Sequence, residues 1–158
     1  MTEQEFDSRV RQMEGKMYRM ARSLLSSDFD SADAMQNAVF AAWRRLSSLK
    51  DETRFESWLM RILINACRDC QRARQKRKGD QPLEEIQLPA EQAPRDMDLR
   101  RALEALPEKY RVPVLLHYET GLSVPDTARV LRLPQTTVKG RIREGLKKLR
   151  AMLKEDEP

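Results

Sequence analysis

The sequence is poor in glycine, cysteine, histidine and aromatic residues, and it has no long apolar stretch. Of its 158 residues, 5 are glycine, 2 are cysteine, 1 is histidine and 6% are aromatic. Two cysteines cannot build a disulfide scaffold, and no apolar run approaches the ~18 residues of a membrane-spanning helix. The first residues, MTEQE, lack the basic and then apolar pattern of a secretory signal. We therefore expect a protein of the reducing cytoplasm, with no membrane contact of its own.

The residues that are abundant favour an all-α fold. Leucine, alanine, arginine, lysine, glutamate and glutamine are frequent and β-branched residues are scattered, which is typical of helical proteins. Lysine and arginine total 30 against 25 acidic residues, so the net charge is +5 and the pI is about 9.4. This excess of positive charge favours a polyanionic partner.

A segment of different composition divides the chain in two. Residues 80–98 contain three prolines, which interrupt helical periodicity, and six acidic residues against one basic residue. This composition predicts an extended or disordered linker. We therefore expect two small helical domains, over residues 1–79 and 99–158, joined by a flexible linker. Bodies of this size gain only a few kcal/mol from their cores, so we expect their mutual orientation to depend on partners.

Apolar residues at spacings of three and four predict three packed helices in the first body, over residues 6–24, 34–46 and 55–70. We expect Asp30 to cap the second of these helices. Thr53 and Glu56 have the spacing of a capping box at the start of the third helix.

The second body has the pattern of a helix-turn-helix. Helices are predicted over residues 96–106 and from Glu108 to a break at Gly121. A short helix capped by Ser123 then runs to about Leu131, and a tight turn at residues 132–134 leads into a long helix. A short helix, a tight turn and a longer helix are the sequence form of this DNA-binding motif.

The basic residues are concentrated on the last helix of each body. Residues 61–79 carry seven basic residues against one acidic residue, and residues 129–150 carry eight against one. Either patch alone is compatible with a solvated helix face. Two patches, one of them on a candidate recognition helix, indicate DNA binding at two separated places. A tether makes the second contact intramolecular, so that two weak modules combine into useful affinity.

Helical phase selects the candidate DNA-reading residues. In the last helix Val138, Ile142 and Leu146 are expected inside, and residues near the start of a recognition helix reach base edges. The residues left on the groove side are Gln135, Thr136, Thr137, Lys139, Gly140, Arg141, Arg143 and Lys147. In the first body the polar residues off the apolar stripe, suited to separated strands, are Asn65, Arg68, Asp69 and Arg72.

No constellation for catalysis is evident. Cys67 and Cys70 have C-x-x-C spacing, but both fall on an apolar stripe, and a second pair of metal ligands is missing. His117 is the one histidine, and Gly79 and Gly121 stand alone rather than in a phosphate-binding loop. We expect no metal, no cofactor and no enzymatic activity.

Four segments in order resemble the extracytoplasmic-function (ECF) sigma factors, two-domain promoter-specificity subunits of bacterial RNA polymerase. Residues 30–43 (DSADAMQNAVFAAW) are similar to the family's D-A-E-D-L-V-Q-E-x-F-x-x-x-W. Residues 55–69 (FESWLMRILINACRD) are similar to F-x-x-W-L-x-x-I-x-x-N-x-x-x-D. In the second body LPEKYRVPVLL resembles L-P-x-x-x-R-x-V-x-x-L, and GLS and PQTTVKGR resemble G-L-S and P-x-G-T-V-K-S-R.

The resemblance implies an alternative sigma factor that binds core polymerase, through its β′ clamp and β flap, and opens a restricted set of promoters. An anti-sigma factor is an implied further partner. The residues 65, 68, 69 and 72 would face the minus-ten element, and the last helix would lie in the major groove of the minus-thirty-five element. The implied β′ clamp contacts are Asp33, Gln36, Asn37, Phe40 and Trp43.

The chain departs from the family pattern at several of these positions. Ala32 and Asn37 stand where the family has acidic residues, so the clamp-binding helix has lost two negative charges. Gly140 replaces a serine, and Glu144 and Gly145 replace alanine and arginine; a glycine in mid-helix costs about 1 kcal/mol.

Two other functions remain open from the sequence. A helix-turn-helix regulator that needs no polymerase explains the second body but leaves the patterns of the first body unexplained. A helical adaptor that never binds DNA requires both basic patches to be inert.

Overall fold

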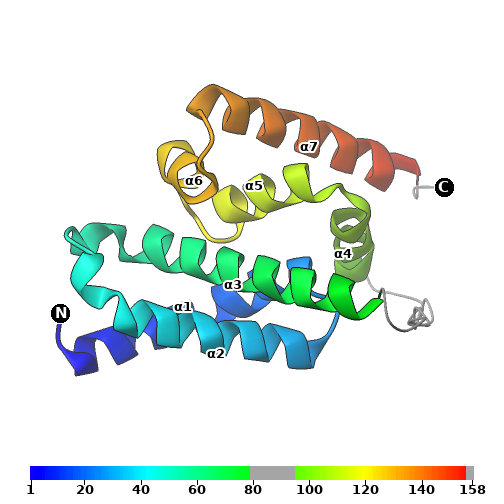
Figure 1. Cartoon of the computed structure of the whole chain (residues 1–158). Helices are drawn as coiled ribbons and strands as arrows, with labels where there is room; N and C mark the ends of the chain where they lie inside the picture. Colours follow the sequence, from blue (N-terminus) through cyan, green and yellow to red (C-terminus); the bar gives the residue numbers. More distant parts are fainter. Residues whose placement is uncertain (79–94, 156–158) are drawn as a thin grey trace.

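The computed structural model describes residues 1–78 and 95–155, and that part of the chain is helical, without a strand. The all-α prediction is therefore confirmed. Figure 1 shows α7 outermost, then α5, then α3, with α1 and α2 on the far side. The helices are α1 (Glu3–Leu24), α2 (Asp28–Arg44), η1 (Leu46–Ser48), η2 (Glu52–Arg54), α3 (Phe55–Lys78), α4 (Arg95–Ala105), α5 (Glu108–Tyr118), α6 (Val124–Leu131) and α7 (Gln135–Glu155).

Most of the predicted linker, residues 80–94, lies outside the described residues. Its last residues are helical, because α4 begins at Arg95 rather than after residue 98. Asp98 stands in the first turn of α4, where negative charge interacts favourably with the helix dipole. The acidity of this residue, which suggested a linker, is therefore also compatible with a helix start.

The N-terminus of α2 differs from the prediction. Ser27, not Asp30, is the N-cap residue, and its hydroxyl accepts a hydrogen bond of 3.0 Å from the backbone N–H of Asp30. The prediction of an Asp30 cap was wrong because the helix starts at Asp28, three residues earlier than a cap at Asp30 implies. Asp30 thus stands inside the first turn, where its charge still favours the helix.

The predicted capping box at α3 is also wrong. A 3₁₀ turn, η2, precedes α3, and Asp51 caps it by accepting a hydrogen bond of 3.0 Å from the backbone N–H of Thr53. Thr53 therefore lies within η2, and α3 begins at Phe55 without a capping box from that threonine. Asp51 and Thr53 both have side chains that can cap a helix, and Asp51, which comes first in the chain, is the one that does so.

The predicted three-helix bundle forms the core of the first body. The buried side chains of α1, among them Phe6, Met13 and Met17, pack with Phe55 and Leu59 of α3. The rings of Phe6 and Phe55 meet edge to face, with centroids 6.0 Å apart. Alanines at the contact face of α2 let this helix approach the other two closely.

The second body packs directly on the first, with α5 against α1 and α6 against α3 (Figure 1). One buried cluster contains core residues of α1, α2 and α3 together with Val112, Leu115, Leu116, Leu122 and Val130. The expectation that orientation depends on partners differs from this structure, in which the two bodies share an apolar interface within the chain itself. We call this set of five side chains the interdomain face.

The corner between α4 and α5 is held by Arg111. Its guanidinium donates hydrogen bonds to the carbonyl oxygens of Glu104 (3.2 Å) and Leu106 (3.0 Å), which belong to the end of α4. Such bonds satisfy carbonyls that the helix itself leaves free. Burial lowers the pKa of Arg111, but an arginine side chain stays charged at any physiological pH.

The helix-turn-helix has the predicted turn. Ser123 caps α6 by accepting a hydrogen bond from the backbone N–H of Asp126, and Arg132 ends it in the left-handed conformation, with φ of 54°. The backbone N–H of Leu133 donates to the carbonyl of Ala128 at 3.0 Å and closes the turn. Helix α7 then follows from Gln135.

Gly145 is required where α7 crosses α5. A Cβ at this position would lie 2.9 Å from Cγ2 of Val114 and 3.3 Å from Cβ of Tyr110. The glycine that costs helix stability in the sequence therefore permits close packing between the two helices. Gly140, about one and a half turns earlier, is the opposite case. A Cβ added there would meet no atom within 4 Å apart from its chain neighbours and the backbone of its own helix.

We predict that these two glycines respond to alanine with opposite signs. Gly145→Ala should lower the free energy of unfolding by about 1–2 kcal/mol, because overpacking outweighs the gain in helix propensity. Gly140→Ala should raise it by about 0.5–1 kcal/mol, because only the propensity changes. Urea denaturation followed by circular dichroism measures both, and equal effects of the two substitutions would contradict the close contact.

The two cysteines lie on α3 as apolar-face residues. Cys67 is buried, and burial, followed by Cys70 and Glu108, raises the pKa of its thiol to about 12. Cys70 is half-buried, and the pKa of its thiol is raised by burial and then by the charges of Asp30 and Asp33. Raised pKa values disfavour the thiolate, which is the reactive form and the metal-binding form.

We predict slow alkylation of both thiols at pH 8. A pKa of about 12 leaves roughly one Cys67 thiolate in ten thousand, so iodoacetamide should modify Cys70 and leave Cys67 intact in the folded chain. Asp33→Asn should speed the reaction of Cys70 a few-fold, because removing a nearby negative charge lowers the thiol pKa. Mass spectrometry of timed samples measures both rates; faster modification of Cys67 than of Cys70 would refute the assignment.

Candidate nucleic-acid interface

The outer face of α2 presents exposed aromatic side chains. Its buried face is made of small residues, so the large side chains point outward: Phe29 is 80% exposed, Phe40 57% and Trp43 43%. Phe40 and Trp43 line a cavity of about 520 Å³ with Glu3 and Asp7 of α1. Exposed aromatics rimmed by acidic groups are typical of a protein-binding surface.

The five predicted polymerase contacts lie on one face of α2. They are spaced three and four residues apart along the helix, so they form one stripe, and all five side chains are exposed. Two hollows flank this stripe: Phe40 and Trp43 line the cavity beside α1, whereas Asp33 and Asn37 line a groove between α2 and α3. Gln36 lines neither of these hollows.

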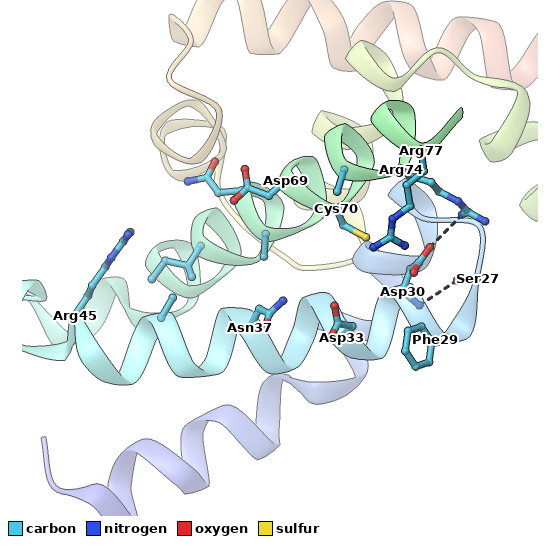
Figure 2. Close-up of a pocket in the computed structure, with 15 residues that line it drawn as sticks. Ser27, Phe29, Asp30, Asp33, Asn37, Arg45, Asp69, Cys70, Arg74 and Arg77 are labelled. Carbon is cyan, nitrogen blue, oxygen red and sulfur yellow. Dashed lines mark hydrogen bonds and ion pairs between the residues drawn. The ribbon is translucent and has the colours of Figure 1, made fainter. Parts of the chain in front are cut away.

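The groove between α2 and α3 has a volume of about 690 Å³ and brings predicted polymerase contacts next to predicted minus-ten contacts. Figure 2 shows Asp33 and Asn37 on α2 facing α3, which carries Asp69 and Cys70. Asn65 lines the same groove. Amide and carboxylate groups on both walls supply hydrogen-bond donors and acceptors suited to base edges or to a protein backbone.

The charges in this groove are balanced, and several are paired. Arg74 forms an ion pair with Asp30 at 3.1 Å (Figure 2). It also donates a hydrogen bond of 2.9 Å to the hydroxyl of Ser26. On the outer side of α3, Arg72 pairs with Asp69 at 3.1 Å. Arg45 and Arg77 line the two ends of the groove.

Arg68 lies apart from the other predicted minus-ten residues. It is half-buried and lines a crevice of about 270 Å³ under α5 and α6. This crevice is also lined by Lys109, by Pro113 and by Arg141 of α7. Three positive charges from three helices therefore meet at the junction of the two bodies, where Glu108 is the acidic neighbour.

Helix α7 is oriented as helical phase predicts. Val138 and Ile142 are buried with Ala128 of α6, so the opposite side of the helix is open. Thr137 and Arg141 are half-buried at the edge of that side. The remaining predicted groove residues are exposed, namely Gln135, Thr136, Lys139, Gly140, Arg143 and Lys147.

Sequence reasoning missed two features of these surfaces. Phe29 lies at the end of the groove and could have been found as an apolar residue outside the alanine stripe of α2. Met60 and Ile64 are fully buried, yet they lie outside the predicted stripe of α3. Their spacing of four residues to each other and to Arg68 signals a second covered face on α3.

The described residues offer no other chemistry. Within residues 1–78 and 95–155 no cluster of three His, Cys, Asp or Glu side chains is placed to hold a metal ion. Among the helices of that part of the chain, none is long and apolar enough to span a bilayer.

Two family models match the chain, one on each body. The model of sigma-70 region 2 matches residues 9–78. The model of sigma-70 region 4 matches residues 96–149. The first covers the α1–α3 bundle, and the second covers α4 to most of α7.

Relatives of known function match both bodies together. The ECF RNA polymerase sigma factor SigM of Mycobacterium tuberculosis is 34% identical over 151 residues, covering 94% of this chain and 76% of SigM. RNA polymerase sigma factor SigV of Bacillus subtilis is 28% identical over 142 residues, covering 88% of this chain and 86% of SigV.

Two solved structures have the same fold across the whole chain. RpoE of Bartonella quintana, in complex with the anti-sigma factor NepR, matches with a TM-score of 0.82 and 25% identity, covering 97% of this chain and 99% of RpoE. CnrH, in complex with the cytosolic domain of CnrY, matches with a TM-score of 0.75 and 26% identity, covering 99% of this chain and 92% of CnrH. The chain therefore belongs to the ECF RNA polymerase sigma factors, alternative sigma factors that direct promoter recognition.

Proposed function

We propose that the chain docks on core RNA polymerase through α2 and reads promoter DNA through α3 and α7. The observation that carries this proposal is that the exposed aromatic surface and the basic surfaces lie on different helices. Exposed aromatics lie on α2, and the two basic patches lie on α3 and α7. A subunit that joins an enzyme to DNA needs such a division, because a protein-binding surface and a phosphate-binding surface differ in charge.

On the polymerase side, the proposed contact is the β′ clamp. Phe40 and Trp43 supply apolar area that a partner would cover, and Asp33 and Gln36 supply polar contacts beside it. Ala32 is exposed, so the acidic residue of the family pattern is absent from a surface position rather than from the core. A second contact, between the α4–α7 body and the β flap, completes the proposed docking.

On the DNA side, α3 faces the minus-ten element and α7 the minus-thirty-five element. Asn65 and Asp69 stand in the open groove, where a base from separated strands has access to their amide and carboxylate groups. On α7, Lys139 and Arg143 are exposed for phosphate or base contacts in the major groove.

The proposed setting is the bacterial cytoplasm, where the chain acts without catalysing a reaction. An anti-sigma factor is a further proposed partner, supported by the similarity to RpoE and CnrH, whose structures were each solved with a partner bound. The region 2 match makes a regulator that never uses polymerase the less favoured reading.

We predict that Asp33→Ala with Gln36→Ala weakens binding to bacterial core polymerase at least tenfold, because both side chains are exposed on the proposed contact helix. Fluorescence anisotropy of the labelled chain measures the affinity. Glu14→Ala, exposed on α1, is the matched control and should leave binding unchanged. Ala32→Glu should tighten binding a few-fold, because it restores the missing charge. Unchanged binding in the double variant would count against the α2 interface.

We predict that Lys139→Ala with Arg141→Ala weakens DNA binding and reduces its salt dependence. Each lost phosphate contact lowers the slope of log K against log salt by about 0.9, so the double variant should lose up to about 2. A titration at several salt concentrations gives the slope. Lys154→Ala, at the far end of α7, should retain the wild-type slope. An unchanged slope in the double variant would show that Lys139 and Arg141 are not phosphate contacts, and a wild-type chain without salt-sensitive DNA binding would favour the adaptor.

A further inference from the structure

A crevice beside α3 gathers three positive charges from three different helices. Arg68 of α3, Lys109 of α5 and Arg141 of α7 line this crevice, which has a volume of about 270 Å³. The apolar part of its wall is formed by the side chains of Val112, Pro113, Leu131 and Leu133. Helices hold side chains more precisely than loops do, so this arrangement of cations is built into the fold.

The cations of this crevice have no anionic partner in the described part of the chain. Among residues 1–78 and 95–155, no side chain forms an ion pair with Arg68, Lys109 or Arg141, and none forms a hydrogen bond with either guanidinium. By contrast, Arg72 and Arg74, further along α3, each pair with a carboxylate at 3.1 Å. The crevice therefore concentrates positive charge that this part of the chain leaves unpaired.

The acidic side chain in the lining of the crevice, Glu108, is engaged elsewhere. Its carboxylate accepts a hydrogen bond of 3.5 Å from the side-chain amide of Gln71. Three positive charges against this one negative charge leave an excess of two positive charges in the lining. Arg68 and Arg141 are both half-buried. A partly desolvated charge without a partner is unfavourable, and an anion that accepts hydrogen bonds from it removes that cost.

We propose that this crevice binds the phosphate group of a small molecule, either inorganic phosphate or a compact phosphate ester. A phosphate group carries about −1.5 to −2 charges at neutral pH, which matches the excess of two, whereas a single carboxylate does not. Guanidinium groups also match the geometry of phosphate oxygens, to which they donate two parallel hydrogen bonds. Pockets for drug-sized ligands have about 300–1,000 Å³, so a crevice of about 270 Å³ suits a smaller ligand.

Phosphate held in the crevice competes with DNA for the same side chains. Arg68 and Arg141 are also candidate promoter contacts, and a guanidinium that holds a small phosphate is not available to a phosphate of the DNA backbone. This consequence rests on the proposed function. Phosphate binding itself goes beyond that function, because it requires neither polymerase nor a promoter and can be measured on the free chain.

Isothermal titration calorimetry of the full chain with inorganic phosphate tests the site, with sodium chloride added to hold the ionic strength constant. Arg68→Gln and Arg141→Gln should each weaken phosphate binding about tenfold, because each loses charge-assisted hydrogen bonds. Lys76→Gln on α3 and Arg150→Gln on α7 remove the same charge from exposed positions outside the crevice, and should leave the affinity unchanged. Acetate, which carries one negative charge, should bind more weakly than phosphate.

Nuclear magnetic resonance checks where the phosphate binds. Titration of the wild-type chain should shift the backbone amide signals of Arg68, Lys109 and Arg141 and leave those of α2 unchanged. Circular dichroism checks that each variant keeps its helices. Lys109→Gln changes an exposed side chain of the crevice, so it tests the site even if an arginine variant fails to fold. It should weaken phosphate binding several-fold.

A chain that binds phosphate no better than acetate would overturn the proposal, and so would equal phosphate affinities of the wild type, the crevice variants and the controls. Anisotropy of a labelled DNA duplex, in phosphate or in chloride at equal ionic strength, separates the two sources of phosphate. We expect phosphate to weaken DNA binding by the wild type and not by Arg68→Gln.

If phosphate binds in the crevice without weakening DNA binding, the site stands and the promoter role of Arg68 and Arg141 fails. If the chain binds DNA through these arginines and does not bind inorganic phosphate, the crevice serves the DNA backbone alone and the proposal fails.

Discussion

The structure depends on the burial of α3 on two sides. One side, with Phe55, Leu59 and Leu63, completes the core of the first body, and the other side meets α6. Full burial of a large apolar side chain is worth about 1.5–3 kcal/mol. The interdomain face contributes five apolar side chains, so even part of that gain is comparable with the few kcal/mol that a core of this size supplies. The stability of each body is therefore coupled to that of the other.

The same helix also carries candidate DNA-reading groups, and its geometry separates the two tasks. Asn65 and Asp69 stand in the open groove with α2, whereas Arg68, one residue before Asp69, lies under the second body. Successive residues on a helix are about 100° apart, so neighbours in sequence reach different surroundings. A contiguous motif can therefore contain residues that face an open groove and a residue that lies under the second body.

The sequence predicted the local structure better than the contacts between distant segments. Periodicity located α1–α3 and the helix-turn-helix, because an amphipathic stripe is a local signal. The caps at Asp30 and Thr53 were misplaced because Ser27 and Asp51, a few residues earlier, offer the same chemistry. The interdomain face was missed for another reason: α5 has apolar residues on both sides, and periodicity shows neither which side meets α7 nor which meets α1. Family resemblance supplied the candidate site residues, but not the two hollows that flank their stripe on α2.

The second body also has packing of its own. Two clusters hold α4, α5, α6 and α7 together without α1 or α3: Val114 packs with Leu149, and Ala128 packs with Val138 and Ile142. Gly145 lets α7 lie close enough to α5 for the first of these contacts. The buried residues of these clusters are distinct from the interdomain face, so the second body has packing that involves neither α1 nor α3. Helix α5 joins the two sets of contacts, because one of its sides packs on α7 and the other on α1, and the position of the recognition helix relative to the first body is therefore set through α5.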